Sequence, residues 1–158
     1  MTFPRLNIPL SQVRTNVTDG VEKIFDPLRG KFVTLTPEEY VRQQFTAWLR
    51  EAFHYPASLM ANEIGVKVNG MSKRCDTVIF RPDGTPLIIV EYKAPDVKIT
   101  QDTFDQIVRY NMTLRAKYLV VSNGLNHYCC VIDYEGNTYH FIPGIPDYNE
   151  LNRAFSDN

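Results

Sequence analysis

The stretch RCDTVIFRPDGTPLIIVEYK, residues 74–93, decides the fold. It consists of two apolar runs that meet at Asp83-Gly84, a dipeptide typical of tight β-hairpin turns. If these two residues form the centre of a type I′ turn, the register of the hairpin follows directly. Asp76 then faces Glu91 across the two strands. The stretch therefore predicts a hairpin that carries a pair of acids near its open end.

Side chains alternate along a strand, so the same register assigns each residue to a face of the hairpin. One face carries Asp76, Val78 and Phe80 together with Leu87, Ile89, Glu91 and Lys93, with Phe80 opposite Leu87 and Val78 opposite Ile89. The other face carries Ile79, Ile88 and Val90. Because both faces are apolar, we expect a buried central hairpin.

Charges at the end of a buried hairpin require a physical explanation. Facing Cβ atoms lie roughly 4.5–5.5 Å apart, and two carboxylates at that distance repel unless a cation joins them. Mg²⁺ suits such a site, because it accepts one or two carboxylates and keeps several waters. Lys93 would orient a water or stabilise charge on a phosphate. The alternative is a buried salt bridge of Lys93 with Glu91 or Asp76 that only holds the strands in register.

The rest of the chain predicts an α/β layer with a mixed sheet. Thr36, Pro37 and Glu39 form a helix start with a capping box, and Pro56 ends that helix near His54. Further elements are strands at 59–68, 73–81, 87–93, 117–122, 127–133 and 138–142, and helices at 101–114 and 147–155. Residues 1–35, with extended pieces at 21–25 and 31–35, are expected to form an N-terminal cap on a single domain that spans 36–158.

Composition excludes several classes of protein. The chain has 158 residues, 44% of them hydrophobic and 22% charged, which is ordinary for a globular domain with its own core. No apolar run approaches the roughly 20 residues of a membrane span. Three cysteines, two of them adjacent, favour a reducing compartment, and we expect the cytoplasm. The net charge of −1 gives no indication of a partner held by global charge alone.

The segments TPEEYVRQ, RCDTVIF, PLIIVEYKAP, QIVRY and YLVVSNG resemble, in this order, the N-terminal nuclease domain of type I restriction enzyme R subunits. The spacing from Asp76 to Glu91-Tyr92-Lys93 is similar to the PD-(D/E)xK nuclease motif. The similarity runs from roughly residue 25 to residue 139. One departure is Cys75, at a position where the family usually has proline. The resemblance implies a restriction-endonuclease-like αβββαβ core, a central mixed sheet flanked by helices.

The resemblance also implies roles for individual residues. Asp76, Glu91 and the Tyr92 carbonyl would ligate Mg²⁺, with Mn²⁺ as an alternative ion, and Lys93 would be the catalytic lysine. A glutamate at the start of the first helix matches Glu38 or Glu39. The helical spacing favours Glu38, whose alternative is a first-turn acid that complements the helix dipole.

Two further groups of residues are candidates for the site. Gln106 and Tyr110 match a QxxxY motif of these R subunits and lie on one helical face at i and i+4, although a solvated glutamine and a half-buried tyrosine are the simpler interpretation. Lys67, Lys73 and Arg74 flank the Asn69-Gly70 turn and could contact DNA phosphates; a solvated turn is the alternative.

Three functions follow as hypotheses. The first is a Mg²⁺-dependent DNA endonuclease, working with motor, modification and specificity subunits of a restriction system. The chain has no GxxxxGK[ST] motif, so the ATP-driven motor and its ATP site are not expected in it. The second is a catalytically silent module that binds DNA or a protein, and the third is the same chemistry on RNA or branched DNA.

Overall fold

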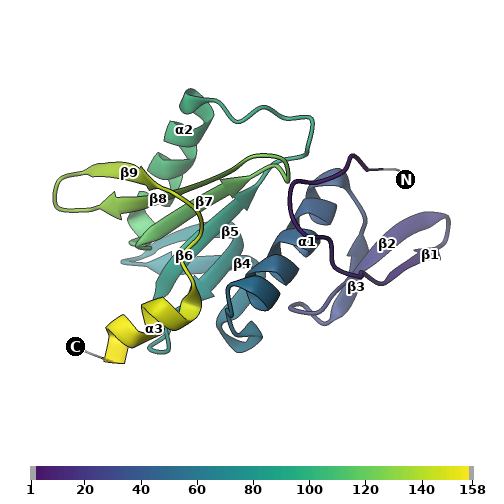
Figure 1. The fold of residues 1–158 in the computed structure, drawn as a ribbon, viewed down its shortest axis with the longest axis horizontal. Helices are drawn as coiled ribbons and strands as arrows, with labels where there is room; N and C mark the ends of the chain where they lie inside the picture. The colour runs from purple at the N-terminus through teal and green to yellow at the C-terminus, as the bar shows by residue number, and fades with distance from the viewer. Residues whose placement is uncertain (1–2, 157–158) are drawn as a thin grey trace.

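The computed structural model describes residues 3–156, which are built around a six-stranded mixed sheet (Figure 1). The strands lie in the order β4 (Met60–Val68), β5 (Met71–Phe80), β6 (Pro86–Tyr92), β7 (Tyr118–Ser122), β8 (His127–Asp133) and β9 (Thr138–Ile142). Only the β6–β7 pair is parallel. The helices are α1 (Pro37–Ala52), α2 (Gln101–Asn111) and α3 (Tyr148–Ser156), with 3-10 turns at Ala57–Leu59 and Met112–Leu114.

The order α1, β4, β5, β6, α2, β7 confirms the predicted αβββαβ core. Helix α2 lies in the crossover between β6 and β7, as a parallel pair requires. Each face of the sheet has its own apolar core. Helix α1 packs on one face through Val41, Phe45 and Leu49, and α2 packs on the other through Phe104 and Val108. The central strands are thus buried on both faces, which explains their continuous apolar runs.

The start of α1 follows the sequence signal only in part. Thr36 caps the helix, and its hydroxyl accepts the Glu39 N–H at 3.0 Å. The Glu39 side chain, however, accepts hydrogen bonds from Arg29, Arg42 and Gln43. The predicted reciprocal capping box is therefore wrong, because these three donors bind the carboxylate that a capping box would direct to the backbone of Thr36.

The loop between β5 and β6 differs from the predicted type I′ turn. Arg81 N–H donates to the Thr85 carbonyl at 2.8 Å, and Gly84 N–H donates to the Arg81 carbonyl at 2.9 Å. Only Gly84 in this loop has a positive φ, +89°, whereas a type I′ turn needs two such residues. The connection is therefore a three-residue loop, 82–84, with glycine at its left-handed position.

A bulge next to this loop restores the predicted register. Phe80 pairs with Pro86, whereas Ile79 pairs with Ile88, so Leu87 is an extra residue in β6. The predicted Phe80–Leu87 pair is wrong, and Leu87 packs into the α1 core rather than beside Ile89. The predicted pairing of Val78 with Ile89 is nevertheless confirmed, because the longer loop and the bulge compensate for each other.

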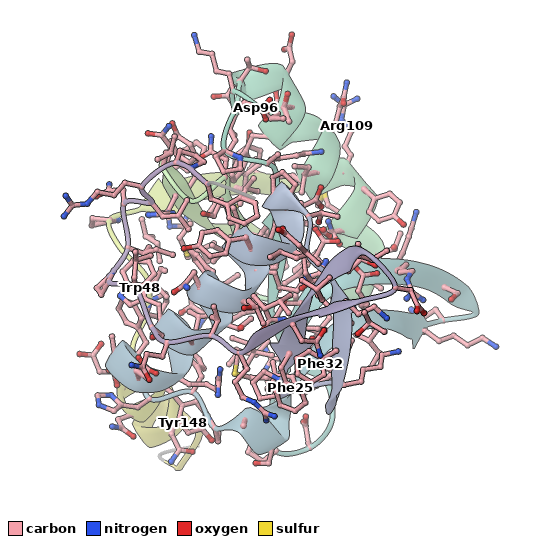
Figure 2. All side chains as sticks on the ribbon, turned by 90° about the vertical axis from the view of Figure 1, so that its right-hand side faces the viewer. Phe25, Phe32, Trp48, Asp96, Arg109 and Tyr148 are labelled. Atoms are coloured by element: carbon pink, nitrogen blue, oxygen red, sulfur yellow. The ribbon has the colours of Figure 1, made fainter. Side chains whose placement is uncertain are left out.

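Before α1, a small antiparallel sheet consists of β1 (Thr15–Thr18), β2 (Val21–Asp26) and β3 (Lys31–Thr34). Two of these strands match the extended pieces expected from the sequence, and β1 was missed. The sheet stands apart from the six-stranded sheet beside α1 (Figure 1). Figure 2 looks onto it, with Phe25 and Phe32 in edge contact at 5.3 Å between ring centroids. Within residues 3–156 no helix has the length and apolarity to cross a bilayer.

Candidate active site

The site lies at a fork in the six-stranded sheet. The ladder between β5 and β6 ends at the pair Thr77–Val90, while β5 continues alongside β4. Asp76 is the next residue beyond that pair on β5, and Glu91 is the next on β6. Oδ2 of Asp76 accepts the Tyr92 N–H at 2.9 Å. Where the two strands separate, this side-chain oxygen therefore takes the place of a backbone carbonyl of β5 as the acceptor for the Tyr92 N–H. The two acids predicted to face each other thus occur together at this fork.

A pocket of about 380 Å³ opens at the fork between α1 and α2. All six residues that the sequence suggested as catalytic line it: Glu38, Asp76, Glu91, Lys93, Gln106 and Tyr110. The remaining lining residues are Arg74, Tyr92, Ile107 and Asn111. Residues that are more than 70 positions apart in the sequence therefore share one small volume.

Glu91 is the most strongly perturbed acid of the pocket. Burial first, and then repulsion from the Asp76 carboxylate, raise its pKa far above the ordinary value. A 3.4 Å hydrogen bond from Asn111 Nδ2 opposes this shift without cancelling it. Without a cation the carboxyl group keeps a proton at neutral pH, and a bound cation would replace that proton.

The structure distinguishes Glu38 from Glu39. Glu38 lines the pocket, and its pKa is raised by burial and then by Asp76, while Arg42 and Lys93 act in the opposite direction. Glu39 is only 8% exposed and lies behind the pocket, in ion pairs with Arg29 and Arg42. Glu38 is therefore the helix glutamate that faces the site.

Helix α2 contributes the opposite wall. Gln106 and Tyr110 lie one turn apart and face the pocket, with Tyr110 45% exposed at its mouth. Lys73 Nζ lies 4.3 Å from the centre of the Tyr110 ring, at the pocket rim. Arg74 lines the pocket, and its Nε donates to Glu63 at 3.1 Å. Lys67 is exposed on β4 and is not part of the lining.

Arg42 is a site residue that the sequence reasoning missed. It is 4% exposed, and its Nη2 lies 3.8 Å from Asp76 Oδ1 while pairing with Glu63. The available signal was its position one turn after Glu38 on α1. Lys93 forms no ion pair within residues 3–156, so the alternative interpretation, a salt bridge of Lys93 with Glu91 or Asp76, is wrong. The cation paired with Asp76 is Arg42.

The pocket residues fit an oxygen-preferring ion that keeps part of its water shell. Asp76 and Glu91 offer carboxylates, and Tyr92 can offer only its backbone, because its side chain is buried and its hydroxyl donates to Thr77 at 2.9 Å. In the part of the chain that the structure describes, no group of three or more His, Cys, Asp or Glu could hold a metal. Two carboxylates and a carbonyl leave several positions for water, as Mg²⁺ prefers.

The fold and this pocket define a restriction-endonuclease-like α/β domain. Residues 37–146 match the family described as type I restriction enzyme R protein N terminus, and the chain belongs to this family. Its fold is also similar to a fragment structure of a protein assigned as an HsdR subunit of a type I restriction enzyme from Vibrio vulnificus YJ016.

That similarity has a TM-score of 0.51 and 22% sequence identity, over 75% of this chain and 25% of the other. The matched part of this chain thus spans about a quarter of the length of that structure's chain. No curated protein matches the chain.

Proposed function

We propose that this domain is a Mg²⁺-dependent endodeoxyribonuclease that hydrolyses phosphodiester bonds. The observation that carries the proposal is the single pocket in which Glu38, Asp76, Glu91 and Lys93 meet at the fork of β5 and β6. Membership of the R-protein family supports it, since these are subunits of restriction enzymes.

Each residue of the pocket has a proposed role that follows from its chemistry. Asp76, Glu91 and the Tyr92 carbonyl hold the ion, for which Mn²⁺ can substitute. When bound, the ion supplies positive charge at the scissile phosphate and lowers the pKa of water. Lys93 orients the attacking water or stabilises the charge that develops on the phosphate. Glu38 lies on the α1 side of the pocket and orients water there.

The pocket rim provides contacts to the substrate. Lys73 and Arg74 are positioned for phosphates, and Gln106 and Tyr110 line the wall along which the backbone would pass. Phosphate contacts carry little sequence information, and the net charge is −1, so affinity of the domain alone for duplex DNA is low. We propose that the motor, modification and specificity subunits of a restriction system act as partners of this domain. These partners would select the DNA sequence and translocate the DNA.

The three free, buried cysteines favour the cytoplasm as the location.

A nicking assay on supercoiled plasmid tests the proposal. Wild type is incubated with Mg²⁺ or Mn²⁺ and compared with Asp76→Asn, which keeps the size of the side chain and removes its charge. The matched control is Asp19→Asn, at an exposed turn of the small sheet. We expect weak nicking by wild type and the control, and none by Asp76→Asn. Equal nicking by all three proteins would show that the cleavage does not depend on Asp76 and would refute the proposal.

The alternative is a catalytically silent module that binds DNA or a protein. One observation favours it: burial and then Asp76 raise the pKa of Glu91, so a proton on Glu91 can balance the pair without a metal. Calorimetry with Mn²⁺ separates the two functions. Binding that is lost in Asp76→Asn supports the nuclease, whereas no binding by wild type supports the silent module.

A further inference from the structure

The turn between β2 and β3 precedes the residues that match the family, yet two chains of contacts connect it to the pocket. Asp26 is fully buried, and its Oδ1 accepts the N–H groups of Leu28 at 2.7 Å and Arg29 at 3.1 Å. Burial opposes ionisation of Asp26, but its bonds to Asn62 and Arg29 outweigh burial and lower the pKa. A buried carboxylate that stays charged needs partners, and those of Asp26 lead towards the site.

A chain of hydrogen bonds runs from the Asp26 carboxylate through uncharged side chains to Tyr92. Asn62 Nδ2 donates to Asp26 at 3.0 Å, and Thr77 Oγ1 donates to Asn62 Oδ1 at 2.6 Å. The Tyr92 hydroxyl then donates to Thr77 at 2.9 Å. These four residues lie on β2, β4, β5 and β6, and the last of them gives its backbone N–H to Asp76 Oδ2.

A second chain, of charged groups, runs from the same turn to the other oxygen of Asp76. Arg29 pairs with Asp26 and donates through Nη2 to Glu39 at 2.7 Å. Arg42 Nη1 donates to the same Glu39 oxygen at 2.9 Å, and Arg42 Nη2 lies 3.8 Å from Asp76 Oδ1. The guanidinium of Arg42 also lies 5.7 Å from the centre of the Tyr92 ring, so the two chains meet again there.

We propose that the turn 26–29 is a positioning element for the Asp76 carboxylate, acting through Arg42 on one oxygen and through Tyr92 on the other. That Asp76 holds a metal ion rests on the proposed function, whereas the positioning of the Asp76 carboxylate does not. Mg²⁺ demands near-ideal octahedral geometry, so a ligand held on both oxygens binds it better than one that rotates. Partners behind a metal ligand typically contribute 10–100-fold in metal affinity.

The first test needs no metal. In EDTA, amide NMR follows the Tyr92 N–H, which donates to Asp76, while the amides of β7 serve as an internal reference. Arg42→Lys keeps the charge but loses the forked geometry that reaches Glu39 and Asp76 together. We expect a shifted Tyr92 resonance and roughly tenfold faster hydrogen exchange, with β7 unchanged. Arg50→Lys, two turns further along α1, is the matched control.

The second variant tests the turn itself. Asp26→Asn removes the charge that holds Arg29, and we expect the same local change at the Tyr92 amide; Asp19→Asn on the same small sheet should have none. If Asp26→Asn does not fold, Arg29→Lys takes its place, because it weakens the same chain by a conservative change. A Tyr92 amide that is unchanged in Arg42→Lys and in the turn variant overturns the proposal, whatever their melting temperatures.

Metal affinity gives an independent measurement. Calorimetry with Mn²⁺ should show roughly tenfold weaker binding for Arg42→Lys and for Asp26→Asn, and no change for the two controls. Equal affinity in all five proteins would overturn the positioning role. If wild type binds no Mn²⁺, the metal site of the proposed function fails, and the Tyr92 amide alone decides the present inference.

Discussion

Replacing Glu91 by glutamine should stabilise the metal-free protein at neutral pH, and Mg²⁺ should reduce this advantage over wild type. Burial and then the neighbouring Asp76 raise the pKa of Glu91, so its carboxyl group keeps a proton in the folded state that it loses in the unfolded state. Glutamine is neutral in both states. The substitution therefore removes the cost of burying an acid and, at the same time, removes a ligand.

The sign and size of the metal-free effect follow from proton linkage. Below the unfolded carboxyl pKa of about 4.3, both states hold the proton and the contribution of Glu91 to stability is fully present. As pH rises towards the folded pKa, unfolding releases the proton, and stability falls by up to about 1.4 kcal/mol per pH unit. From pH 5 to 7 the loss is about 2.6 kcal/mol, or roughly 5–10 °C in melting temperature for a domain of this size. Glu91→Gln should not show this fall.

Mg²⁺ acts in the opposite direction. An ion that binds only the folded state at ten times its Kd stabilises that state by about 1.4 kcal/mol. Wild type should gain this stabilisation, and Glu91→Gln should gain little of it. The stability advantage of Glu91→Gln over wild type at pH 7.5 should therefore shrink by about 1.4 kcal/mol between EDTA and Mg²⁺.

Thermal melts at pH 5, 6, 7 and 7.5, in EDTA and in Mg²⁺, measure both effects. Glu135→Gln, at the exposed turn between β8 and β9, is the matched control and should follow wild type throughout. If Glu91→Gln is less stable than wild type in EDTA by the same amount at every pH, Glu91 is not held protonated and the electrostatic reasoning fails. If Mg²⁺ raises the melting temperatures of wild type and Glu91→Gln by the same amount, the ion does not bind at Glu91.

Three further substitutions test other parts of the site and fold. Lys93→Ala should abolish plasmid nicking while changing the free energy of unfolding in EDTA by less than about 1 kcal/mol, because Lys93 makes no ion pair within residues 3–156. Tyr92→Phe removes the buried bond to Thr77 and should lower stability in urea titrations by about 1–2 kcal/mol. Thr36→Ala removes the cap that accepts the Glu39 N–H and should cost about 1 kcal/mol in the same titration.

The elements of the core could be predicted because their signals are local. Helix α1 needed only its cap, the proline after it and an apolar stripe, and the Asn69-Gly70 turn needed only two residues that tolerate φ of +51° and +79°. The loop at 82–84 shows where this reasoning fails. Asp83-Gly84 fits both a two-residue and a three-residue loop, and the bulge at Leu87 has no mark in the sequence. The predicted register of β5 and β6 was right because the longer loop and the bulge shift the pairing in opposite directions.

The pocket could be predicted to a similar extent. Asp76, Glu91 and Lys93 lie on one hairpin, so alternation along the strands brought them together. Gln106 and Tyr110 were found through family resemblance, since no periodicity joins α2 to that hairpin. The network behind the pocket was missed because its members come from separate elements, with Asp26 and Arg29 on the small sheet and its turn. In the sequence, Arg42 has no feature that distinguishes it from other helix arginines.

That network also gives a reason why the pocket would attract a cation, as the proposed function requires. The ion-pair cluster contains three arginines and three acids, namely Arg29, Arg42 and Arg74 with Asp26, Glu39 and Glu63. Burial opposes ionisation of Glu63, but Arg42 and Arg74 together outweigh it and lower the pKa, so the cluster is neutral as a unit. What remains in the pocket is Glu38, Asp76 and Glu91 against Lys93. When these acids ionise, a divalent ion would match the excess negative charge, and no other group lining the pocket would. In the proposed site the arginines behind the pocket therefore orient Asp76 and leave the place of the metal to the ion.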